Sequence, residues 1–387
     1  MLSLYVHIPF CHSKCPYCDF NSAALENIPE EEYALSLMSE LSMLSSKLGL
    51  EGKDIGSVYF GGGTPSILRS SAIKRIMYSI ASTFNVIKDA EITIEANPED
   101  LVDEKIEAWL ESGFNRLSVG VQSLDVDLLK SLGRRHTPQD SIEGITLAKN
   151  LGFTNLNVDI ICGVEGEDLT RFMDDIKGAL ELEPEHISLY ALTVEKGTDY
   201  YERSLRGLLS LPEDESVLEM LKCGRETILN SGYVHYEISN YALHGRECAH
   251  NLSYWQGGDY IGIGAGAHSA VTFLDGESLP IRKRWANIED ITSYIRLAKK
   301  GREPSAWGEE LSGERLGFEY LFLGLRTISG VSLAEYKSLA GIDLEDKYPG
   351  VLDVLVSSGF IAKDGDRIYL TEKGLWVADG VIENFAI

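Results

Sequence analysis

Residues 5–21 read YVHIPFCHSKCPYCDFN, and this run contains three cysteines, Cys11, Cys15 and Cys18, in the spacing C-x3-C-x2-C. A cubane 4Fe–4S cluster has four irons and is normally held by four cysteine thiolates. Three thiolates would therefore leave one iron open to a small molecule. The run predicts a site where an iron–sulfur cluster and a small molecule meet.

Two other kinds of cysteine site fit the same spacing. A structural zinc needs four ligands, and His7 or His12 could supply the fourth. A disulfide is disfavoured because no secretory signal precedes the run and cytosolic thiols stay reduced. The surroundings favour a cluster, because residues 4–8 (LYVHI) predict a short strand and the cysteines follow on the next loop. In a barrel, the loops after the strands form the end where chemistry is usually found.

The motif CHSKCPYC, with an aromatic residue before its third cysteine, resembles the radical S-adenosylmethionine (SAM) superfamily. The longer phrase YVHIPFC is similar to a narrower group, which includes the oxygen-independent coproporphyrinogen oxidases and the HemW-type heme chaperones. The resemblance extends from Leu4 to the C-terminus. It implies a 4Fe–4S cluster held by Cys11, Cys15 and Cys18, with S-adenosylmethionine as the exchangeable ligand of the open iron.

Composition limits the classes of partner. The chain has 387 residues, of which 44% are apolar and 25% charged, enough for one large core and a smaller one. Its formal net charge of −25 disfavours nucleic acids and anionic membranes as partners. No uncharged apolar run is long enough for a transmembrane helix, and no secretory signal begins the chain. We expect a cytoplasmic protein, and a homodimer is compatible with these bounds.

Short β-rich runs alternate with helical periods up to about residue 230, which predicts a parallel sheet covered by helices. The predicted strands are Leu4–Ile8, Ser57–Phe60, Glu91–Glu95, Arg116–Val121, Asn155–Ile161 and His186–Ala191. The predicted helices between them are Glu31–Leu48, Ser70–Phe84, Asp103–Ser112, Pro138–Leu151 and Leu169–Leu182. Six such units resemble the partial, TIM-like (β/α)6 barrel of radical SAM enzymes. We assign residues 1–210 to this α/β core.

Two further regions follow the predicted barrel. Residues 211–307 combine a helix, Glu213–Asn230, with glycine-rich loops and form a region that flanks the barrel. The predicted helices of residues 308–387 are Glu309–Leu325, Ser332–Ala340 and Tyr348–Ser358, with Pro349 in the first turn of the last one. A hairpin signal over residues 360–370 follows them. Helices with a small β wing predict a mostly helical, winged-helix-like domain, and its acidic residues favour contact with protein or substrate over DNA.

Polar and glycine residues after the predicted strands are candidate cofactor ligands. GGGTPS at Gly61–Ser66 follows the second strand, and glycines let a backbone approach a ligand closely. The resemblance assigns Gly62, Gly63 and Thr64 to the methionyl amino group of S-adenosylmethionine. Strand-end positions of a barrel are commonly functional. The other residues that we expect to bind S-adenosylmethionine are Tyr5, Tyr17, Glu95, Gln122, Arg134 and Asp159.

Two sequence motifs later in the chain indicate contact with a flat ligand or with an iron-containing one. GIGAGAHS at Gly262–Ser269 lacks the spacing of a dinucleotide-binding loop and predicts a segment where another backbone or a flat ligand lies close. HNLSYW at His250–Trp255 places a histidine beside two aromatic residues, which can ligate heme iron and cover the macrocycle. It resembles the HNxxYW motif of heme chaperones, which implies that His250 is an axial heme ligand. Cys248 is an alternative ligand.

The family group contains two classes of function. One is an enzyme, the oxygen-independent coproporphyrinogen III oxidase, which decarboxylates its substrate through a radical. The other is a chaperone that binds heme and passes it to acceptor proteins. The oxidases carry a fourth cysteine two residues after the third, where this chain has Phe20, and they have a long extension before the first strand. Both departures favour a heme chaperone without coproporphyrinogen dehydrogenase activity.

Overall fold

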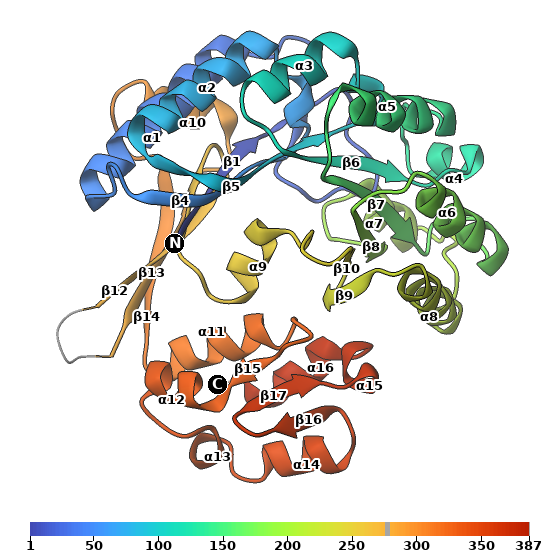
Figure 1. Cartoon of the computed structure of the whole chain (residues 1–387), viewed down its shortest axis with the longest axis vertical. Helices are drawn as coiled ribbons and strands as arrows, with labels where there is room; N and C mark the ends of the chain where they lie inside the picture. Colours follow the sequence, from blue (N-terminus) through green and yellow to red (C-terminus); the bar gives the residue numbers. More distant parts are fainter. Residues whose placement is uncertain (275–278, 387) are drawn as a thin grey trace.

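The computed structural model describes residues 1–274 and 279–386. Within these residues, a curved sheet of twelve strands forms the centre of the fold (Figure 1). From one edge to the other its strands are β14 (Ser305–Ser312), β13 (Ile281–Asn287), β12 (His268–Phe273), β11 (Tyr260–Ile263), β1 (Leu2–Ile8), β4 (Asp54–Gly62), β5 (Asn85–Ala96), β6 (Arg116–Gln122), β7 (Leu156–Cys162), β8 (His186–Ala191), β10 (Asn240–Ala242) and β9 (Val234–Glu237). All pairs from β11 through β8 are parallel.

The six strands β1, β4, β5, β6, β7 and β8 confirm the predicted partial (β/α)6 barrel. Helices cover the convex face of the sheet, while its concave side faces α9 and the C-terminal part (Figure 1). The helices and 3-10 turns of this part are α1 (Glu30–Leu48), η1 (Pro65–Ile67), α2 (Ser70–Thr83), η2 (Pro98–Asp100), α3 (Asp103–Glu111), α4 (Val126–Ser131), α5 (Pro138–Leu151), α6 (Leu169–Glu181), α7 (Asp199–Leu205), α8 (Asp214–Asn230), α9 (Ala249–Trp255) and α10 (Ile291–Ala298). The five predicted barrel helices (α1, α2, α3, α5 and α6) begin and end within one residue of their predicted bounds, while α4 and α7 were not predicted.

Successive residues of each strand point to opposite faces of the sheet. On β4, Val58 and Phe60 are fully buried among the covering helices. The alternate residues of β4 point to the concave side. There the Ser57 hydroxyl contacts His250, and the Tyr59 hydroxyl donates to Glu95. The pleat therefore places the apolar residues in the core and a set of polar residues inside the barrel.

Neither edge of the sheet was predicted, since β10 and β9 extend it beyond β8 and four further strands extend it beyond β1. Strands β11 to β14 continue the sheet beyond β1, and β12, β13 and β14 pair in antiparallel fashion. The expected helix over Glu309–Leu325 is therefore wrong in its first part, because residues 305–312 form β14 and pair with β13. Gly313, at a positive φ of 56°, ends this strand, and α11 (Glu314–Gly324) begins after it.

The C-terminal part has its own hydrophobic cluster, built around residues such as Leu321, Tyr336 and Phe385. Its elements are α11, β15 (Val331–Ser332), α12 (Leu333–Ala340), α13 (Leu344–Lys347), α14 (Val351–Ser357), β16 (Ile361–Asp364), β17 (Arg367–Leu370), α15 (Glu372–Leu375), α16 (Ala378–Ile382) and η3 (Glu383–Phe385). The wing is confirmed as a sheet in the order β15-β17-β16. Pro349 precedes α14 instead of lying in its first turn, because Gly350 occupies the N-cap.

The segment GIGAGAHS packs closely against other parts of the backbone. A Cβ on Gly264, which has a φ of 110°, would lie 2.6 Å from the carbonyl oxygen of His7. The amide of Gly264 donates to the buried carboxylate of Glu40, which also accepts from the Tyr294 hydroxyl at 2.6 Å and the Asn287 amide. Burial raises the pKa of Glu40 to about 7. This carboxylate ties α1 to the β11 and α10 regions.

Candidate functional site

The three predicted cluster cysteines lie on one closed loop. Strand β2 (Phe10–Cys11) pairs in parallel with β3 (Ala23–Ala24), and this pairing brings the two ends of the loop together. Inside the loop, the Cys18 amide donates to the Cys15 carbonyl at 3.1 Å. The ammonium group of Lys14 donates to two backbone carbonyls further along the loop, each at 3.2 Å. These bonds hold a segment that has little regular structure of its own.

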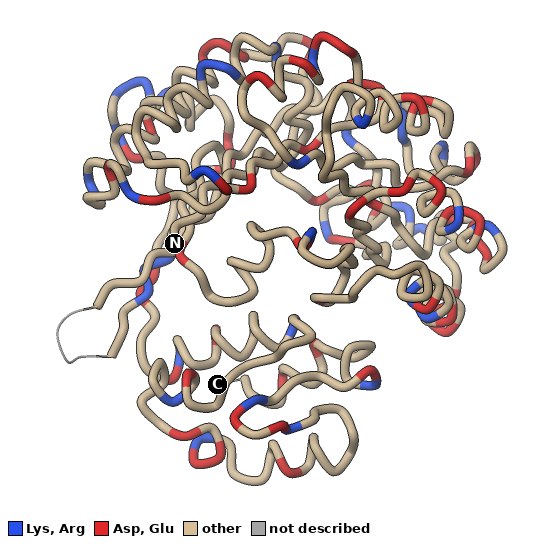
Figure 2. The backbone as a smooth tube through the Cα atoms, in the orientation of Figure 1, with Lys and Arg blue, Asp and Glu red and all other residues tan. Residues whose placement is uncertain are grey.

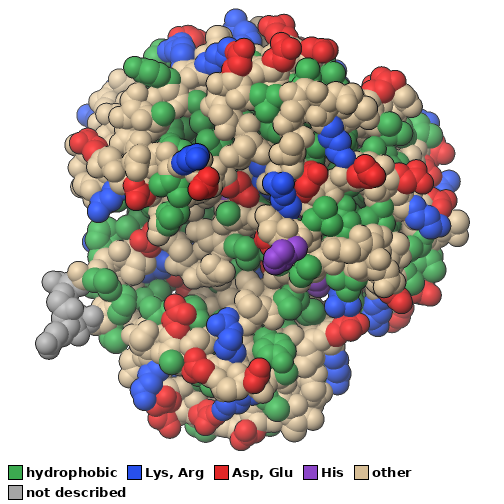
Figure 3. Space-filling model, in the orientation of Figure 1, with side chains coloured by type: hydrophobic (Ala, Val, Ile, Leu, Met, Phe, Trp, Pro, Cys, Tyr) green, Lys and Arg blue, Asp and Glu red, His purple; other side chains and the backbone are tan. Residues whose placement is uncertain are grey.

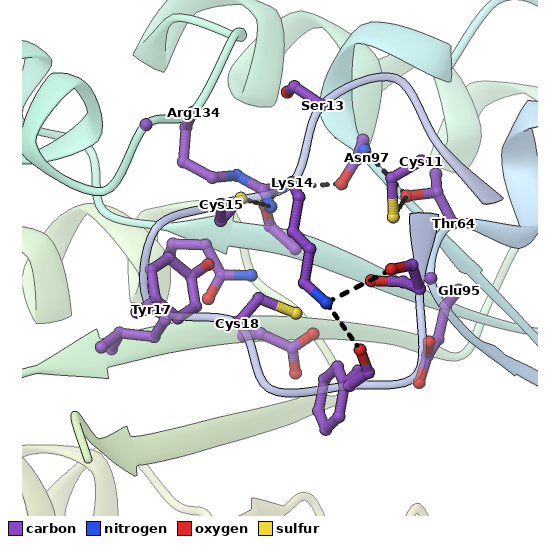
Figure 4. Close-up of a pocket in the computed structure, with 18 of the residues that line it drawn as sticks. Cys11, Ser13, Lys14, Cys15, Tyr17, Cys18, Thr64, Glu95, Asn97 and Arg134 are labelled. Atoms are coloured by element: carbon purple, nitrogen blue, oxygen red, sulfur yellow. Dashed lines mark hydrogen bonds between the residues drawn. The ribbon is translucent and has the colours of Figure 1, made fainter. Parts of the chain in front are cut away.

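The cysteine loop covers a cavity of about 410 Å³ at the C-terminal ends of the barrel strands. Figure 4 shows the cysteine side chains with Glu95, Asn97 and Arg134 around this cavity. Of the residues predicted to bind the cluster or S-adenosylmethionine, those that line the cavity are Cys11, Cys15, Tyr17, Cys18, Gly62, Gly63, Thr64, Glu95, Gln122, Arg134 and Asp159. The structure thus brings together residues from five strands and their loops.

Backbone packing of the GGGTPS loop positions Cys11. The Gly63 amide donates to the Ile8 carbonyl at 2.8 Å, and a Cβ on Gly63 would lie 2.7 Å from the Phe10 carbonyl oxygen and 3.0 Å from Cys11 Sγ. The Thr64 hydroxyl donates to the same sulfur at 3.5 Å. Glycine is needed here because the chain passes so close to the cysteine loop.

Arg134 supplies a positive charge beside the cysteines. Its Nη2 donates to Asn97 Oδ1 at 2.7 Å and to the Gly120 carbonyl at 2.9 Å. Its Nη1 donates to Cys15 Sγ at 3.7 Å. The cavity therefore has a cationic wall on the Cys15 side.

The carboxyl groups of Glu95 and Asp159 also lie in the cavity wall. Glu95 accepts from the Tyr59 hydroxyl at 2.8 Å and from the Gly62 amide at 3.2 Å, and burial raises its pKa to about 7. Asp159 accepts from the Asn157 amide at 2.7 Å, and burial also raises its pKa. Further charged residues of both signs line the cavity, namely Lys14, Arg135, Asp19, Glu99 and Glu195. A wall with both signs of charge suits a ligand that carries both as well.

Gln122 has strained backbone geometry at the end of β6. Its φ of 66° is unusual for a residue with a side chain, and the β6–β7 pairing shifts register just before it. Left-handed backbone costs about 1–3 kcal/mol at a non-glycine residue and is concentrated at functional sites. The bend directs the Gln122 side chain into the cavity wall.

The thiol groups fit a cluster better than a single metal ion. Cys11, Cys15 and Cys18 are free, and burial raises the pKa of Cys11 and Cys18. In the part of the chain that the structure describes, no three His, Cys, Asp or Glu side chains converge on one ion position. A zinc needs such convergence, with sulfur about 2.3 Å from the metal. In a 4Fe–4S cluster each cysteine thiolate ligates a different iron. Three cysteine sulfurs placed around one cavity, without a common ion position, therefore match the ligands of a cluster.

The two histidines considered as zinc ligands differ in their surroundings. His7 is buried behind the cavity, where its Nε2 contacts the Asn21 carbonyl at 2.8 Å and its Nδ1 contacts the Tyr5 hydroxyl at 3.0 Å. Tyr5 therefore lies outside the cavity wall and supports His7. His12 lines the cavity, with its Nε2 at 3.6 Å from Asp100 Oδ1.

His250 does not lie in this cavity. Its side chain is 1% exposed, its Nδ1 is 2.8 Å from the Ser57 hydroxyl, and its Nε2 is 2.8 Å from the Tyr254 hydroxyl. The ring also stacks on Tyr59, with 5.0 Å between the ring centroids. Cys248 is buried as well, and its sulfur donates to Glu91 Oε1 at 3.4 Å. In this conformation neither predicted heme ligand has an exposed donor atom.

Several cavity residues were not predicted. Asn97 comes two residues after Glu95 and connects Arg134 to Thr64, whose hydroxyl accepts from the Asn97 amide at 3.4 Å. Tyr190 lies near the end of β8 and lines the cavity, so its strand-end position could have predicted it as the same kind of position predicts Glu95. Phe20 also lines the mouth of the cavity and is 63% exposed.

The outer surface shows no single dominant charge on the faces drawn. Acidic and basic residues are interspersed along the outer helices and the C-terminal part (Figure 2). The face in Figure 3 likewise mixes both signs with apolar side chains. Among the described residues, no helix has both the length and the apolar character that a bilayer crossing requires.

Comparisons with known proteins identify the family. A model of the radical SAM superfamily matches residues 5–178, and a model of the HemN C-terminal domain matches residues 311–377. The heme chaperone HemW of Escherichia coli K12 is 34% identical over 99% of this chain and 98% of its own length. The Bacillus subtilis HemW is 36% identical over 100% and 99%. This chain belongs to the HemW family of radical SAM proteins.

The fold of this HemW family member is shared with a solved enzyme structure. Coproporphyrinogen III oxidase (HemN) from E. coli superimposes with a TM-score of 0.83, covering 99% of this chain and 89% of the enzyme. The two sequences are 23% identical, so the likeness establishes the fold alone. It confirms that the barrel and the C-terminal part are arranged as in that enzyme.

The packing of Gly63 leads to a testable prediction. Gly63→Ala should push the GGGTPS loop away from Cys11 and lower the iron and acid-labile sulfide bound per chain after anaerobic reconstitution. Overpacking of this kind typically lowers the free energy of unfolding by about 1–3 kcal/mol. Gly380→Ala, which places its Cβ in open space on α16, is the matched control and should keep wild-type iron content. Unchanged iron and sulfide in Gly63→Ala would contradict this account of the loop.

Proposed function

We propose that this chain is a heme chaperone, which binds heme and transfers it to acceptor proteins on a radical SAM scaffold. The match with the E. coli and B. subtilis HemW proteins carries the proposal, because it covers at least 98% of both chains in each comparison. A match of this extent includes the barrel, the HNLSYW segment and the C-terminal part together. Other expectations stay predictions: the existence of acceptor proteins, a homodimer, the cytoplasmic location, and the domain boundaries at residues 210 and 307.

Cys11, Cys15 and Cys18 are the proposed cluster ligands. When bound, a 4Fe–4S cluster supplies an iron with an open coordination position and one-electron redox chemistry. The chain contributes the closed loop that carries the thiols, the Thr64 hydroxyl that donates to Cys11 and the Arg134 guanidinium group beside Cys15. Hydrogen bonds to the ligating sulfurs are one of the factors that set the reduction potential of a bound cluster.

The remaining cavity residues are proposed to bind S-adenosylmethionine. Its methionyl part carries a carboxylate and an amino group, and its sulfonium adds a positive charge. Arg134 offers a cation to the carboxylate, while Glu95 and Asp159 offer negative charge to the cationic groups. The Gly62–Thr64 backbone, Tyr17 and Gln122 complete the wall. Tyr5 acts from behind the wall through His7.

His250 is the proposed axial ligand of heme. Neutral imidazole is the form that ligates a metal, and burial together with Arg116 lowers the pKa of His250 to about 3. Both ring nitrogens are hydrogen bonded in this structure, so ligation requires His250 to leave its present contacts. Cys248, two residues earlier, remains the alternative ligand.

The alternative function is the radical decarboxylation of coproporphyrinogen III. The shared fold with HemN is the observation in its favour. Against it, Phe20 occupies the position of the fourth cysteine of the oxidases, and its exposed ring lines the cavity mouth. The chaperone proposal accounts for this substitution without requiring decarboxylase activity.

One experiment separates the two functions. The anaerobically reconstituted full-length protein is incubated with heme in one sample, and with coproporphyrinogen III, S-adenosylmethionine and a reductant in another. We expect stoichiometric heme uptake, followed by absorption spectroscopy after gel filtration, and no protoporphyrinogen. Sustained conversion to protoporphyrinogen without retention of heme would establish the oxidase instead.

The pKa of Glu95 predicts how S-adenosylmethionine binding depends on pH. Burial raises this pKa to about 7, so the group is neutral below that pH and a carboxylate above it. Because the carboxylate attracts the cationic ligand, affinity should rise by about tenfold between pH 6 and pH 8. Isothermal titration of the reconstituted protein measures this change.

Two variants control the pH experiment. Glu95→Gln should bind S-adenosylmethionine more weakly and with little pH dependence over the same range. Glu40→Gln removes another buried carboxyl group with a pKa of about 7, but Glu40 lies outside the cavity. It should keep the wild-type pH dependence. A pH profile of Glu95→Gln that equals the wild-type profile would show that another group is responsible.

A further inference from the structure

Helix α9, which carries His250, is held on the concave side of the barrel, where it packs against β4 (Figure 1). Nδ1 of the His250 ring contributes one of the contacts that hold the helix, to Ser57 of β4, while Nε2 contacts Tyr254 of the same helix. A ring nitrogen ligates iron through its lone pair, which must be free and reachable. With the ring 1% exposed, the present position of α9 excludes a heme from His250.

The N-terminal end of α9 is attached to β5 through Glu91. The Glu91 carboxylate accepts from the Ala249 and His250 amides, each at 3.0 Å, and from the Cys248 thiol at 3.4 Å. The buried guanidinium group of Arg116 lies 3.9 Å from the same carboxylate. One acidic side chain thus holds both predicted heme ligands in the closed position.

The C-terminal end of α9 is attached through Arg282. Its guanidinium nitrogens donate to the carbonyls of Gly257 and Gly258, which directly follow the helix, at 2.6 and 2.8 Å. Arg282 also pairs with Glu319 of α11 at 3.1 Å. Gly257 has a φ of 70°, so the chain turns sharply at this point. These contacts connect α9 with the C-terminal part of the chain.

We propose that α9 is a latch and that the structure shows its closed state. Heme binds only after α9 leaves β4, which frees His250 and Cys248 to approach the iron. This inference rests on the proposed heme function. The apparent dissociation constant for heme then equals the intrinsic constant divided by the fraction of molecules with α9 released. Any change that weakens the closed contacts without touching the heme should therefore strengthen heme binding.

Ser57 provides the sharpest test because it belongs to the barrel and contacts His250 only in the closed state. Ser57→Ala removes the hydrogen bond to Nδ1 and also the one that the Ser57 hydroxyl donates to Ser3 of β1. The net stabilisation typical of the one bond that holds α9 corresponds to an increase of about two- to tenfold in the released fraction. We expect a decrease of the same size in the apparent dissociation constant, with an unchanged spectrum of the bound heme. Ser269→Ala is the matched control, because Ser269 is also buried and, among the described residues, its hydroxyl bonds only to the backbone of Gly262. It should bind heme as the wild type does.

The experiment titrates the reconstituted full-length protein and its variants with hemin, and records association rates and absorption spectra. His250→Ala should change the spectrum and weaken binding. Ser57→Ala with wild-type affinity and rate would overturn the latch, while heme uptake by the wild type would still support the proposed function. An unchanged heme spectrum in both His250→Ala and Cys248→Ala would overturn the latch as well. Failure of every protein to bind heme would overturn the proposed function itself.

A second measurement does not depend on any variant. Hydrogen–deuterium exchange of the wild type is followed over residues 249–255 with and without bound heme. The latch predicts that heme increases deuterium uptake in this segment, because the backbone contacts with Glu91 are lost. Equal uptake in both states, with heme shown to be bound, would contradict it.

Discussion

The pleat of the parallel strands is the constraint on which the rest of the structure depends. Apolar residues such as Val58 and Phe60 face the helices, so the alternate positions must face the inside of the barrel. These positions carry hydroxyl, carboxyl, guanidinium and imidazole groups, which are costly to bury unless they are paired. Tyr59 with Glu95 and Ser57 with His250 are two such pairs on one strand. The barrel interior is therefore a connected polar network instead of an apolar core.

This network has two ends with different roles. At the C-terminal ends of the strands it opens into the cavity, where Arg134 and Glu95 lie near the cysteine loop. Toward the starts of the strands it is filled by α9, which Glu91 and Ser57 hold in place. Tyr59 is common to both, because its hydroxyl bonds to Glu95 and its ring stacks on His250. The proposed cofactor site and the proposed heme ligand thus share one set of strands.

Much of the fold could be predicted from the sequence, because strongly periodic segments alternate and each barrel unit buries its own apolar face. The strand β14 could not, since residues 305–312 are strand only through pairing with β13. The cavity was largely predictable from strand-end positions and the cysteine motif. Tyr190 was missed because sequence alone does not show which strand-end residue faces inward. The burial of His250 was also hidden, because its partner Ser57 is 193 positions away in the chain.

The central claim is that three thiolates around one cavity hold an iron–sulfur cluster and leave one iron open. Metal and acid-labile sulfide analysis of anaerobically prepared, full-length protein tests it most directly. The account predicts about four irons and about four sulfides per chain, the content of a single cubane cluster. Stoichiometric zinc with no acid-labile sulfide would contradict it.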